Sequence, residues 1–374
     1  MTSRSFLGYL AGRIGASLAA LGIWIISPGE AFSAQAAGQR IPGPASMASV
    51  SRADTPPRKV LVGTAICGER LFTMPLAQRL QRMDDLVETA AAQARSEYPG
   101  KRLDLVVLPE YFLARPGDSM AQETVNLDEV LPRVAGCARA HGCYLVVPLL
   151  MQEAGLPLRY SNAALVVDRG GGLLGIYRKV HPVAAQGSDV LEGGTTPGGE
   201  YPVFDCDFGR LGVQICFDMF YGEGWQSLAD QGAEIVALPS ASPETVRPTF
   251  YAFQHHYYVV SASPRDHAAV YSPLGMIEAQ VTAESVLVHE IDLSYAILHW
   301  ESALEEGEAL RRKYGERVGF NYYHSEDNGL FWSNDPKMTI GQMIGSLNLT
   351  ESDTNVERVR MLEDRARGGP PKVP

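Results

Sequence analysis

Short apolar runs alternate with amphipathic segments between residues 58 and 296, and this order predicts the fold class. Apolar runs of about four to eight residues are typical of buried strands, whereas apolar residues that recur every three or four positions are typical of helices. The predicted strands are residues 59–66, 103–108, 144–150, 161–168, 175–180, 212–216, 235–238, 257–262 and 285–291. The predicted helices are residues 76–94 and 127–141. We therefore expect one layered α/β domain that begins near Arg58.

Three consecutive glycines, Gly170, Gly171 and Gly172, separate two of these predicted strands. Glycine adopts positive φ without steric cost, so the segment predicts a hairpin turn.

The alternation of short apolar runs and amphipathic segments ends after Asp292. Residues 302–318 predict a long charged amphipathic helix, followed by an aromatic and polar loop and a short helix near Ile340. We expect residues 297–374 to form an extension without a core of its own, which packs on the main domain or on a partner subunit.

The first 36 residues have the features of a secretory signal peptide. Arg4 and Arg13 precede an apolar run at residues 14–26, and small residues follow, so cleavage is predicted before Ala37. An uncleaved membrane anchor is the alternative, but the run is shorter than the roughly 20 apolar residues of a spanning helix. We expect a secreted or periplasmic protein with no stable membrane span after signal removal.

Residues 37–57 are rich in Ala, Ser, Pro and Gly and predict a flexible linker to the folded domain. Hydrophobic residues make up 45% of the whole chain and charged residues 20%, which favours a globular protein over a disordered one. The formal net charge of −11 and the lack of a basic stripe argue against a nucleic-acid partner.

The chain has five cysteines, an odd number for a protein expected in an oxidising compartment. Disulfide pairing or burial as free thiols both remain open for four of them, Cys67, Cys137, Cys143 and Cys206.

Three chemically competent residues each stand at or just after the end of an apolar run, where a strand delivers a side chain to the rim of a sheet. They are Glu110, Lys179 and Cys216. Partial burial suits a carboxylate to proton transfer, and a thiol needs both a base and a nearby cation to act as a nucleophile. Each residue alone has an ordinary explanation as a solvated charge or a core thiol. Only the occurrence of all three in one chain indicates a catalytic site.

The three motifs Leu108-Pro109-Glu110, Tyr177-Arg178-Lys179-Val180-His181 and Ile215-Cys216-Phe217-Asp218 together resemble the signature of the nitrilase superfamily of carbon–nitrogen hydrolases. The resemblance covers residues 58–296. It implies a four-layer-forming α-β-β-α sandwich that assembles into a homodimer or higher homo-oligomer.

The resemblance also implies the roles of the residues. Glu110 is expected to be the base, Lys179 to stabilise the oxyanion together with the backbone N–H of Phe217, and Cys216 to form a thioester with the substrate. Glu192 is similar to a second family glutamate that holds the lysine and orients the substrate, with Glu200 as the alternative.

Other positions limit the resemblance. Glu223 agrees with an acid that many members place beyond the cysteine, where a structural role is equally compatible. Residues 251–255 depart from the family pattern, so we expect a changed packing or substrate wall there. The adjacent histidines 255 and 256 have no further ligand at suitable spacing, so we expect neither a metal nor a cofactor.

Phe217-Asp218 after the cysteine resembles the amidase and carbamoylase branches more than the nitrile-hydrolysing branch. We therefore expect a small-molecule amide-like substrate, with a nitrilase or a catalytically inactive binding or scaffold protein as alternatives. A membrane acyltransferase carries a similar domain but requires several spanning helices.

Overall fold

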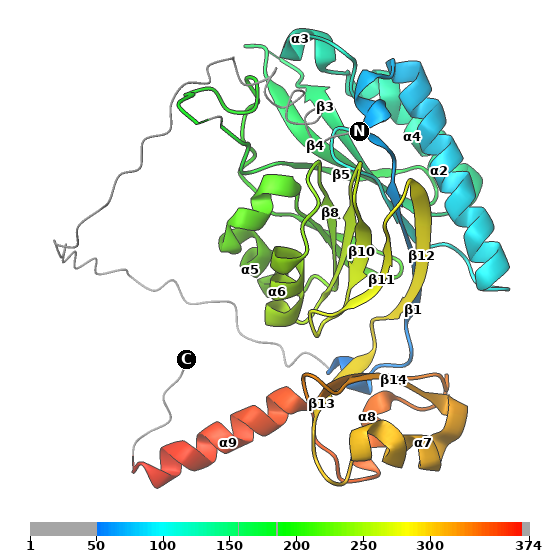
Figure 1. Ribbon diagram of the computed structural model, residues 1–374, viewed down its shortest axis with the longest axis vertical. Helices are drawn as coiled ribbons and strands as arrows, with labels where there is room; N and C mark the ends of the chain where they lie inside the picture. Colours follow the sequence, from blue (N-terminus) through cyan, green and yellow to red (C-terminus); the bar gives the residue numbers. More distant parts are fainter. Residues whose placement is uncertain (1–50, 156, 185, 369–374) are drawn as a thin grey trace.

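The computed structural model describes residues 51–155, 157–184 and 186–368, and its main part contains two six-stranded sheets that pack face to face (Figure 1). In spatial order, the first sheet comprises β12 (Ser285–Asp292), β1 (Lys59–Ile66), β2 (Leu105–Val107), β3 (Tyr144–Gln152), β4 (Tyr160–Val167) and β5 (Leu173–Arg178). The second comprises β11 (Ile277–Val281), β10 (Ala268–Tyr271), β9 (Tyr258–Ala262), β8 (Ile235–Pro239), β7 (Gly209–Val213) and β6 (Val203–Cys206).

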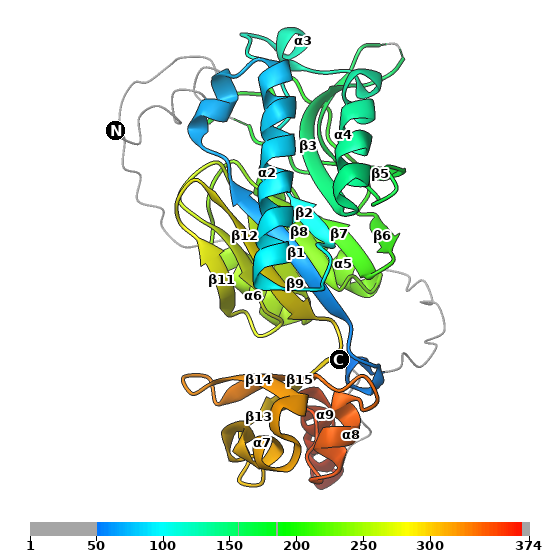
Figure 2. The same cartoon turned by 90° about the vertical axis from the view of Figure 1, so that its right-hand side faces the viewer.

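Helices cover the outer face of each sheet. Figure 2 shows α2 (Leu76–Glu97) and α4 (Leu127–His141) over the first sheet, and Figure 1 shows α5 (Gly222–Asp230) and α6 (Val246–His255) on the opposite side of the molecule. Short helices lie in the connections: η2 (Glu69–Thr73), α3 (Met120–Glu123) and η3 (Cys216–Phe220). This arrangement confirms the predicted α-β-β-α sandwich.

Strand β1 illustrates why its apolar run is continuous. Val60 and Val62 pack between the two sheets, whereas Leu61 and Ala65 pack against the helical layer. Successive side chains of a strand point to opposite faces, so a strand covered on both sides needs apolar residues at nearly every position.

The hairpin predicted at the three glycines joins β4 to β5. Gly171 has a φ of 82°, and Asp168 receives hydrogen bonds from the backbone N–H groups of Gly170 and Gly172 at 2.7 and 2.8 Å. The turn therefore uses the conformational freedom of glycine, as expected.

Residues 295–366 form a separate unit below the sandwich (Figure 2). Its three-stranded antiparallel sheet has the order β13 (Tyr295–His299), β15 (Asn328–Ser333), β14 (Val318–Tyr323). Its helices are η4 (Glu305–Gly307), α7 (Glu308–Tyr314), η5 (Gly315–Arg317), α8 (Ile340–Gly345) and α9 (Ser352–Ala366).

The sequence prediction for this unit differs from the structure in three respects. The segment before Asp335, expected to be an aromatic and polar loop, contains strands β14 and β15. The expected long helix at residues 302–318 is limited to α7, because the backbone turns at Gly307 and Gly315, whose φ angles are 102° and 59°. The unit also has its own apolar cluster, which includes Leu304, Leu310 and Phe331.

The segment before β1 joins this C-terminal unit. Residues 52–54 form η1 (Arg52–Asp54), and Ala53 is buried in the apolar cluster of the unit, although we expected a flexible linker here. The predicted signal peptide, its cleavage site and the linker up to residue 50 lie outside the described residues. Among the described helices, none is both long and apolar enough to cross a membrane.

All five cysteines lie in the described part of the chain, and none of them forms a disulfide. Cys67, Cys137 and Cys143 are buried, and Cys206 is half-buried. These four thiols therefore behave as small apolar side chains.

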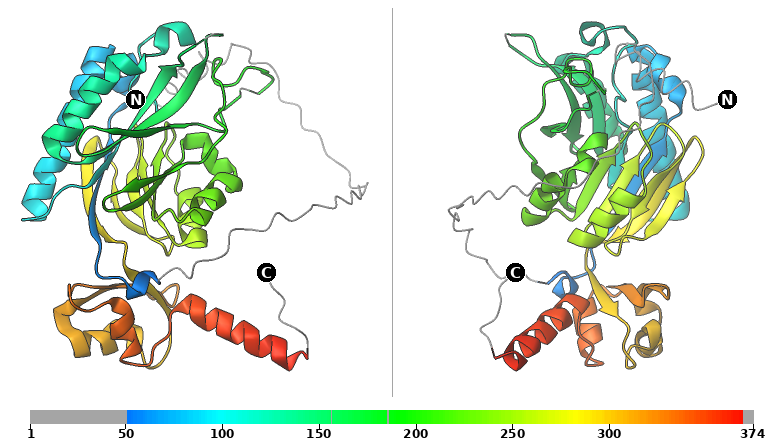
Figure 3. Two further views of the ribbon diagram at one scale, coloured as in Figure 1. Left: turned by 180° about the vertical axis from the view of Figure 1, so that it is seen from behind. Right: turned by 60° about the vertical axis from the view of Figure 1, so that its left-hand side comes forward.

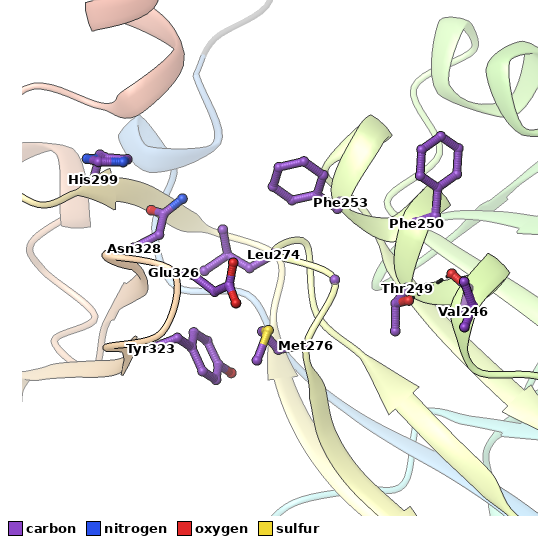
Figure 4. A pocket seen from close by; sticks show the side chains of 11 residues that line it. Val246, Thr249, Phe250, Phe253, Leu274, Met276, His299, Tyr323, Glu326 and Asn328 are labelled. Carbon is purple, nitrogen blue, oxygen red and sulfur yellow. Dashed lines mark hydrogen bonds between the residues drawn. The ribbon is translucent and has the colours of Figure 1, made fainter.

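A cavity of about 550 Å³ separates α6 from the C-terminal unit (Figure 4). Phe250 and Phe253 of α6 line one wall, and Tyr323 and Glu326 of the β14–β15 hairpin line the other. None of the candidate catalytic residues lines this cavity, so their site lies elsewhere.

Candidate active site

Glu110 lies in the loop after β2 and is completely buried. Its Oε2 atom accepts a hydrogen bond from the backbone N–H of Ala241 at 2.8 Å, which ties the carboxylate to the end of β8 in the other sheet. The next residue, Tyr111, has a φ of 59°, and its carbonyl accepts a hydrogen bond from the guanidinium of Arg79 at 2.9 Å. A buried cation from α2 thus holds the strained turn that carries the carboxylate.

Lys179 follows β5 directly and is 1% exposed. Its Nζ atom donates to Oε1 of Glu110 at 2.8 Å and to Oε1 of Glu192 at 2.9 Å. Burial alone would lower the pKa of Lys179, but the two carboxylates more than offset this effect and hold that pKa well above its usual value. The ammonium therefore remains charged.

Glu192 belongs to the loop between β5 and β6 and has a φ of 41°. Its Oε1 atom accepts hydrogen bonds from Lys179 and from the hydroxyl of Tyr111. The Oε2 atom is buried and has no hydrogen-bond partner among the described residues. Glu200, the alternative from the sequence, is exposed.

Asn162 of β4 is a member of this cluster that the sequence analysis did not identify. Its Nδ2 atom donates to Oε1 of Glu110 at 2.7 Å and to Oε1 of Glu192 at 3.1 Å. An amide at the start of a strand that is otherwise largely apolar is the signal that could have found it, because a buried amide requires partners.

Cys216 begins η3, three residues after β7 ends, so the predicted strand at residues 212–216 is too long at this end. The residue has a φ of 46°, and its side chain is half-buried. A non-glycine residue with positive φ is strained, and such strain is often found at functional sites.

The thiol lies in the electrostatic field of the charged cluster. Burial and the negative charge of Glu110 raise the pKa of Cys216 to about 12, although the charge of Lys179 and hydrogen bonds from Ser240 and Ala241 oppose this rise. The resting group at neutral pH is therefore a thiol, and attack requires a base.

Asp218, in the turn that begins at Cys216, joins this turn to the loop that carries Lys179. Its Oδ1 atom accepts the N–H of His181 at 2.8 Å, and its Oδ2 atom accepts the hydroxyl of Tyr177 at 2.7 Å. Asp218 is fully buried, which explains an acidic residue at this position without a role in catalysis.

The remaining positions from the sequence lie around this cluster. Phe217 is half-buried in the first turn of η3, where backbone N–H groups have no partner within the helix. The side chain of Glu223 is 60% exposed and lies 3.4 Å from Nε2 of His181. The Tyr251 ring stacks on Trp225 with centroids 4.5 Å apart, so part of the divergent segment at residues 251–255 packs in the core.

The sequence model of a carbon-nitrogen hydrolase family matches residues 63–298, which include the buried cluster and both sheets. The chain belongs to the carbon–nitrogen hydrolase family. The C-terminal unit after β13 lies outside the matched residues.

Curated relatives of this carbon–nitrogen hydrolase include omega-amidases. The chain is 30% identical to omega-amidase NIT2-A of Xenopus laevis over 233 residues, which is 55% of this chain and 82% of that protein. It is also 30% identical to omega-amidase NIT2 of Homo sapiens over 208 residues, which is 50% of this chain and 70% of that protein. The chain is thus a hydrolase of the nitrilase superfamily with amidases among its relatives.

Solved structures share the fold. Nit3 of Saccharomyces cerevisiae, described as a member of branch 10 of the nitrilase superfamily, aligns with a TM-score of 0.52 at 23% identity and covers 69% of this chain and 95% of its own. A carbon-nitrogen hydrolase from Helicobacter pylori G27 aligns with a TM-score of 0.52 at 21% identity and covers 68% of this chain and 93% of its own. At these identities the likeness concerns the fold alone.

Proposed function

We propose that this carbon–nitrogen hydrolase cleaves an amide or carbamoyl bond through a thioester on Cys216, releasing an acid and ammonia or an amine. The observation that carries the proposal is the buried cluster in which Lys179 bridges Glu110 and Glu192 within the electrostatic reach of the thiol. A base, a fixed cation and a thiol are the three groups that thiol hydrolysis requires.

The hydrogen bonds of Glu110 favour one oxygen as the proton acceptor. Oε1 already accepts from Lys179 and Asn162, whereas within the described part of the chain Oε2 accepts only the N–H of Ala241. A carboxylate oxygen accepts two hydrogen bonds, so Oε2 keeps a site for the thiol proton. The N–H of Ala241 also lowers the pKa of Cys216, which supports Oε2 as the acceptor of the thiol proton.

In the first half of the reaction, Oε2 of Glu110 takes the thiol proton while the sulfur attacks the carbonyl carbon. The oxyanion that develops is held by the ammonium of Lys179 and the backbone N–H of Phe217. Collapse of this intermediate breaks the carbon–nitrogen bond, and the leaving nitrogen takes the proton from Glu110.

In the second half, Glu110 removes a proton from water, and the hydroxide formed attacks the thioester carbon. The carbon–sulfur bond breaks, and the sulfur recovers the proton from Glu110. The sum is amide plus water to acid plus ammonia or amine.

Glu192 supports the recognition of a substrate with an N–H donor. Its Oε2 atom is buried and has no partner among the residues that the structure describes, and such an acceptor is costly unless a ligand or water supplies a hydrogen. An amide N–H meets this need, whereas a nitrile nitrogen carries no hydrogen to donate.

The test uses the full chain with a panel of primary amides, carbamoyl compounds and nitriles, and it measures both ammonia and acid. We expect turnover of amides or carbamoyl compounds and a loss of about 10⁴-fold or more in Cys216→Ala. Turnover of nitriles alone would make the protein a nitrilase. Full turnover by Cys216→Ala would refute the thioester route, and a folded wild-type protein inert to the whole panel would favour a scaffold role.

We further propose that the chain forms a homodimer or higher homo-oligomer. Figure 3 shows α9 extending away from the rest of the molecule, with Val356, Met361 and Leu362 about half exposed. A helix of 15 residues is only marginally stable in water without packing, so a covering surface is required. Phe250 and Phe253 on α6 are exposed apolar residues of the same molecule.

Sedimentation of a chain that ends at residue 351 tests this proposal, because the deletion removes α9 and leaves the apolar cluster of the C-terminal unit intact. A shift towards monomer relative to the full chain is expected. A full chain that is monomeric, or a truncated chain with the same mass as the full assembly, would contradict it.

A further inference from the structure

We infer that Asn162 is a positioning residue, which holds the carboxylates of Glu110 and Glu192 in the orientation that leaves one oxygen of Glu110 open to the thiol. The inference rests on the proposed function, since it concerns the same site.

Two donors span the same pair of carboxylate oxygens. Nζ of Lys179 lies 2.8 and 2.9 Å from the Oε1 atoms of Glu110 and Glu192, and Nδ2 of Asn162 lies 2.7 and 3.1 Å from the same two atoms. Lys179 supplies one positive charge to two buried carboxylates. One negative charge therefore depends on neutral donors, and Asn162 is a neutral donor to both carboxylates.

The orientation of the Asn162 amide follows from its neighbours. A carbonyl oxygen cannot donate to a carboxylate, so the NH₂ group must face the two glutamates, and each of its hydrogens serves one of them. The side chain is 1% exposed, so bulk water does not replace it. The amide thus fixes which oxygen of each glutamate is occupied.

The backbone of Asn162 is fixed as firmly as its side chain. The residue pairs with Leu150 across the β3–β4 ladder, and its carbonyl accepts the backbone N–H of Lys179 at 2.8 Å. One residue therefore sets the backbone of the cation and the side-chain orientation of both carboxylates. A strand in the middle of a sheet is a rigid support for such a role.

Loss of the Asn162 donor should shift the pH dependence of the site in one direction. A buried carboxylate that loses a hydrogen bond to its charged form binds a proton more readily, so the pH dependence of a site that relies on this donor would change. A purely structural role would lower the amount of folded enzyme but would leave the pH dependence of the remaining activity in place.

The experiment compares Asn162→Leu and Asn162→Asp with the wild-type chain. Thr64→Val serves as a control, because it removes another buried hydrogen bond, from Thr64 Oγ1 to the carbonyl of Ser261, outside the carboxylate cluster. For each protein, thermal unfolding is measured together with the pH dependence of kcat/KM. Alkylation of Cys216 by iodoacetamide, followed by mass spectrometry, gives a second pH profile that needs no substrate.

The lower midpoint of the alkylation profile reports the first proton lost by the coupled acidic groups of the site. Asn162→Leu is expected to move the lower midpoint of both profiles upward by roughly one pH unit. Asn162→Asp, which adds a third carboxylate without a change of shape, moves it further upward. The fall in kcat/KM at neutral pH is expected to be about 10-fold to 100-fold.

Midpoints that coincide with those of the wild-type chain in both variants would overturn the inference, as would an equal shift in Thr64→Val. If Asn162→Leu folds poorly, the isosteric Asn162→Asp decides the question alone. If the alkylation midpoint moves but no amide is hydrolysed by the wild-type chain, the proposed function fails and the positioning role stands. If amides are hydrolysed but the midpoints stay in place, only the positioning role fails.

Discussion

The carboxylate of Asp218, two residues after the proposed nucleophile, accepts a hydrogen bond of 2.8 Å from the backbone N–H of His181, two residues after Lys179. Its other oxygen accepts the backbone N–H of Ile215 at 2.9 Å. One buried side chain thus joins loops that leave strands of different sheets. The separation of the sulfur and the ammonium is therefore set largely by a third residue.

Asp218→Asn tests the role of these two hydrogen bonds, because the amide keeps the shape of the carboxylate but replaces one acceptor oxygen with a donor NH₂ group. One oxygen cannot satisfy the backbone N–H groups of both His181 and Ile215, so one of these donors would face the NH₂ group without an acceptor. We expect the free energy of unfolding to fall by about 1–3 kcal/mol and kcat/KM to fall at least about tenfold. Denaturant unfolding and steady-state kinetics measure the two effects.

Asp205→Asn is the matched control, since the Asp205 side chain is 83% exposed and pairs only with Arg210 among the described residues. It should leave both quantities close to those of the wild-type chain. Wild-type stability and activity in Asp218→Asn would show that the hydrogen bonds of the Asp218 carboxylate are needed neither for folding nor for activity.

Glu110→Gln is expected to raise the rate at which Cys216 is alkylated and to lower the rate of amide hydrolysis. The charge of Glu110 helps to raise the pKa of Cys216 to about 12, so its removal leaves Lys179 to lower that pKa. Below the pKa, each unit of decrease gives about tenfold more thiolate, so iodoacetamide should label Cys216 about tenfold faster or more at pH 7.5. Hydrolysis should nevertheless fall about 10⁴-fold, because no base remains to shuttle protons.

Labelling rates and amide turnover of the same preparation measure both effects. Glu223→Gln removes a mostly exposed carboxylate near His181 and should alter neither. A joint fall of labelling and turnover in Glu110→Gln would contradict the assignment of Glu110 as the base.

The main domain could be predicted from the sequence because its elements are covered by other layers. The predicted strand at residues 59–66 and the predicted helix at 127–141 agree with β1 and α4 at both ends. The strand is a continuous apolar run and the helix has apolar residues at helical spacing, and burial requires these patterns. The C-terminal unit lacks this signal, because turns at Gly307 and Gly315 interrupt a segment that has the charge pattern of a helix.

The site could be predicted only at residues whose side chains are reactive or charged and stand in recognisable motifs. Glu110, Lys179 and Cys216 follow strands, so their approach could be expected from topology. The contacts of Asn162 with two glutamates, and of the Ala241 N–H with Glu110, depend on register between strands and on the packing of one sheet against the other. No local pattern encodes those contacts, so they required the structure.

Gly198→Ala should disturb the site through the backbone. The N–H of Gly198 donates to the carbonyl of Lys179 at 2.8 Å, and a Cβ atom at this position would overlap the carbonyl oxygen of Arg178. The strand end that carries Lys179 would have to move, so kcat is expected to fall about 100-fold for a displacement near 1 Å. Gly199→Ala is the control, because a Cβ there meets no atom within 4 Å. Equal activity of the two variants would contradict this expectation.

The attachment of α9 should depend on pH through His256. Its Nδ1 atom lies 3.1 Å from the carbonyl of Pro273, and its Nε2 atom lies 3.5 Å from Oδ2 of Asp353 at the start of α9. Two acceptors require two N–H groups, so the bound form is the imidazolium. Burial and the nearby charge of Arg52 lower the pKa of His256, but Asp353 and the Pro273 carbonyl raise it above its ordinary value of 6.5.

Both His256 and Asp353 contribute to the dependence of α9 attachment on pH. A raised pKa of His256 gives stability that is complete below 6.5 and is lost as pH rises through the folded value. The hydrogen bond with His256 lowers the pKa of Asp353, so its contribution is present above 3.8 and is lost as pH falls through the folded value. Amide hydrogen exchange in the first turn of α9, corrected for the intrinsic rate, should therefore be slower at pH 5.5 than at pH 8.5.

His256→Gln provides the comparison, since glutamine keeps a donor but does not titrate. The difference in protection of α9 between the two pH values should disappear in this variant, while protection in β1, which is remote from the pair, should be the same in both proteins. If α9 were held by its apolar residues instead of by this ion pair, protection in the wild-type chain would be equal at the two pH values. That result would assign the anchoring of α9 to the residues around Leu349 in the apolar cluster of the C-terminal unit.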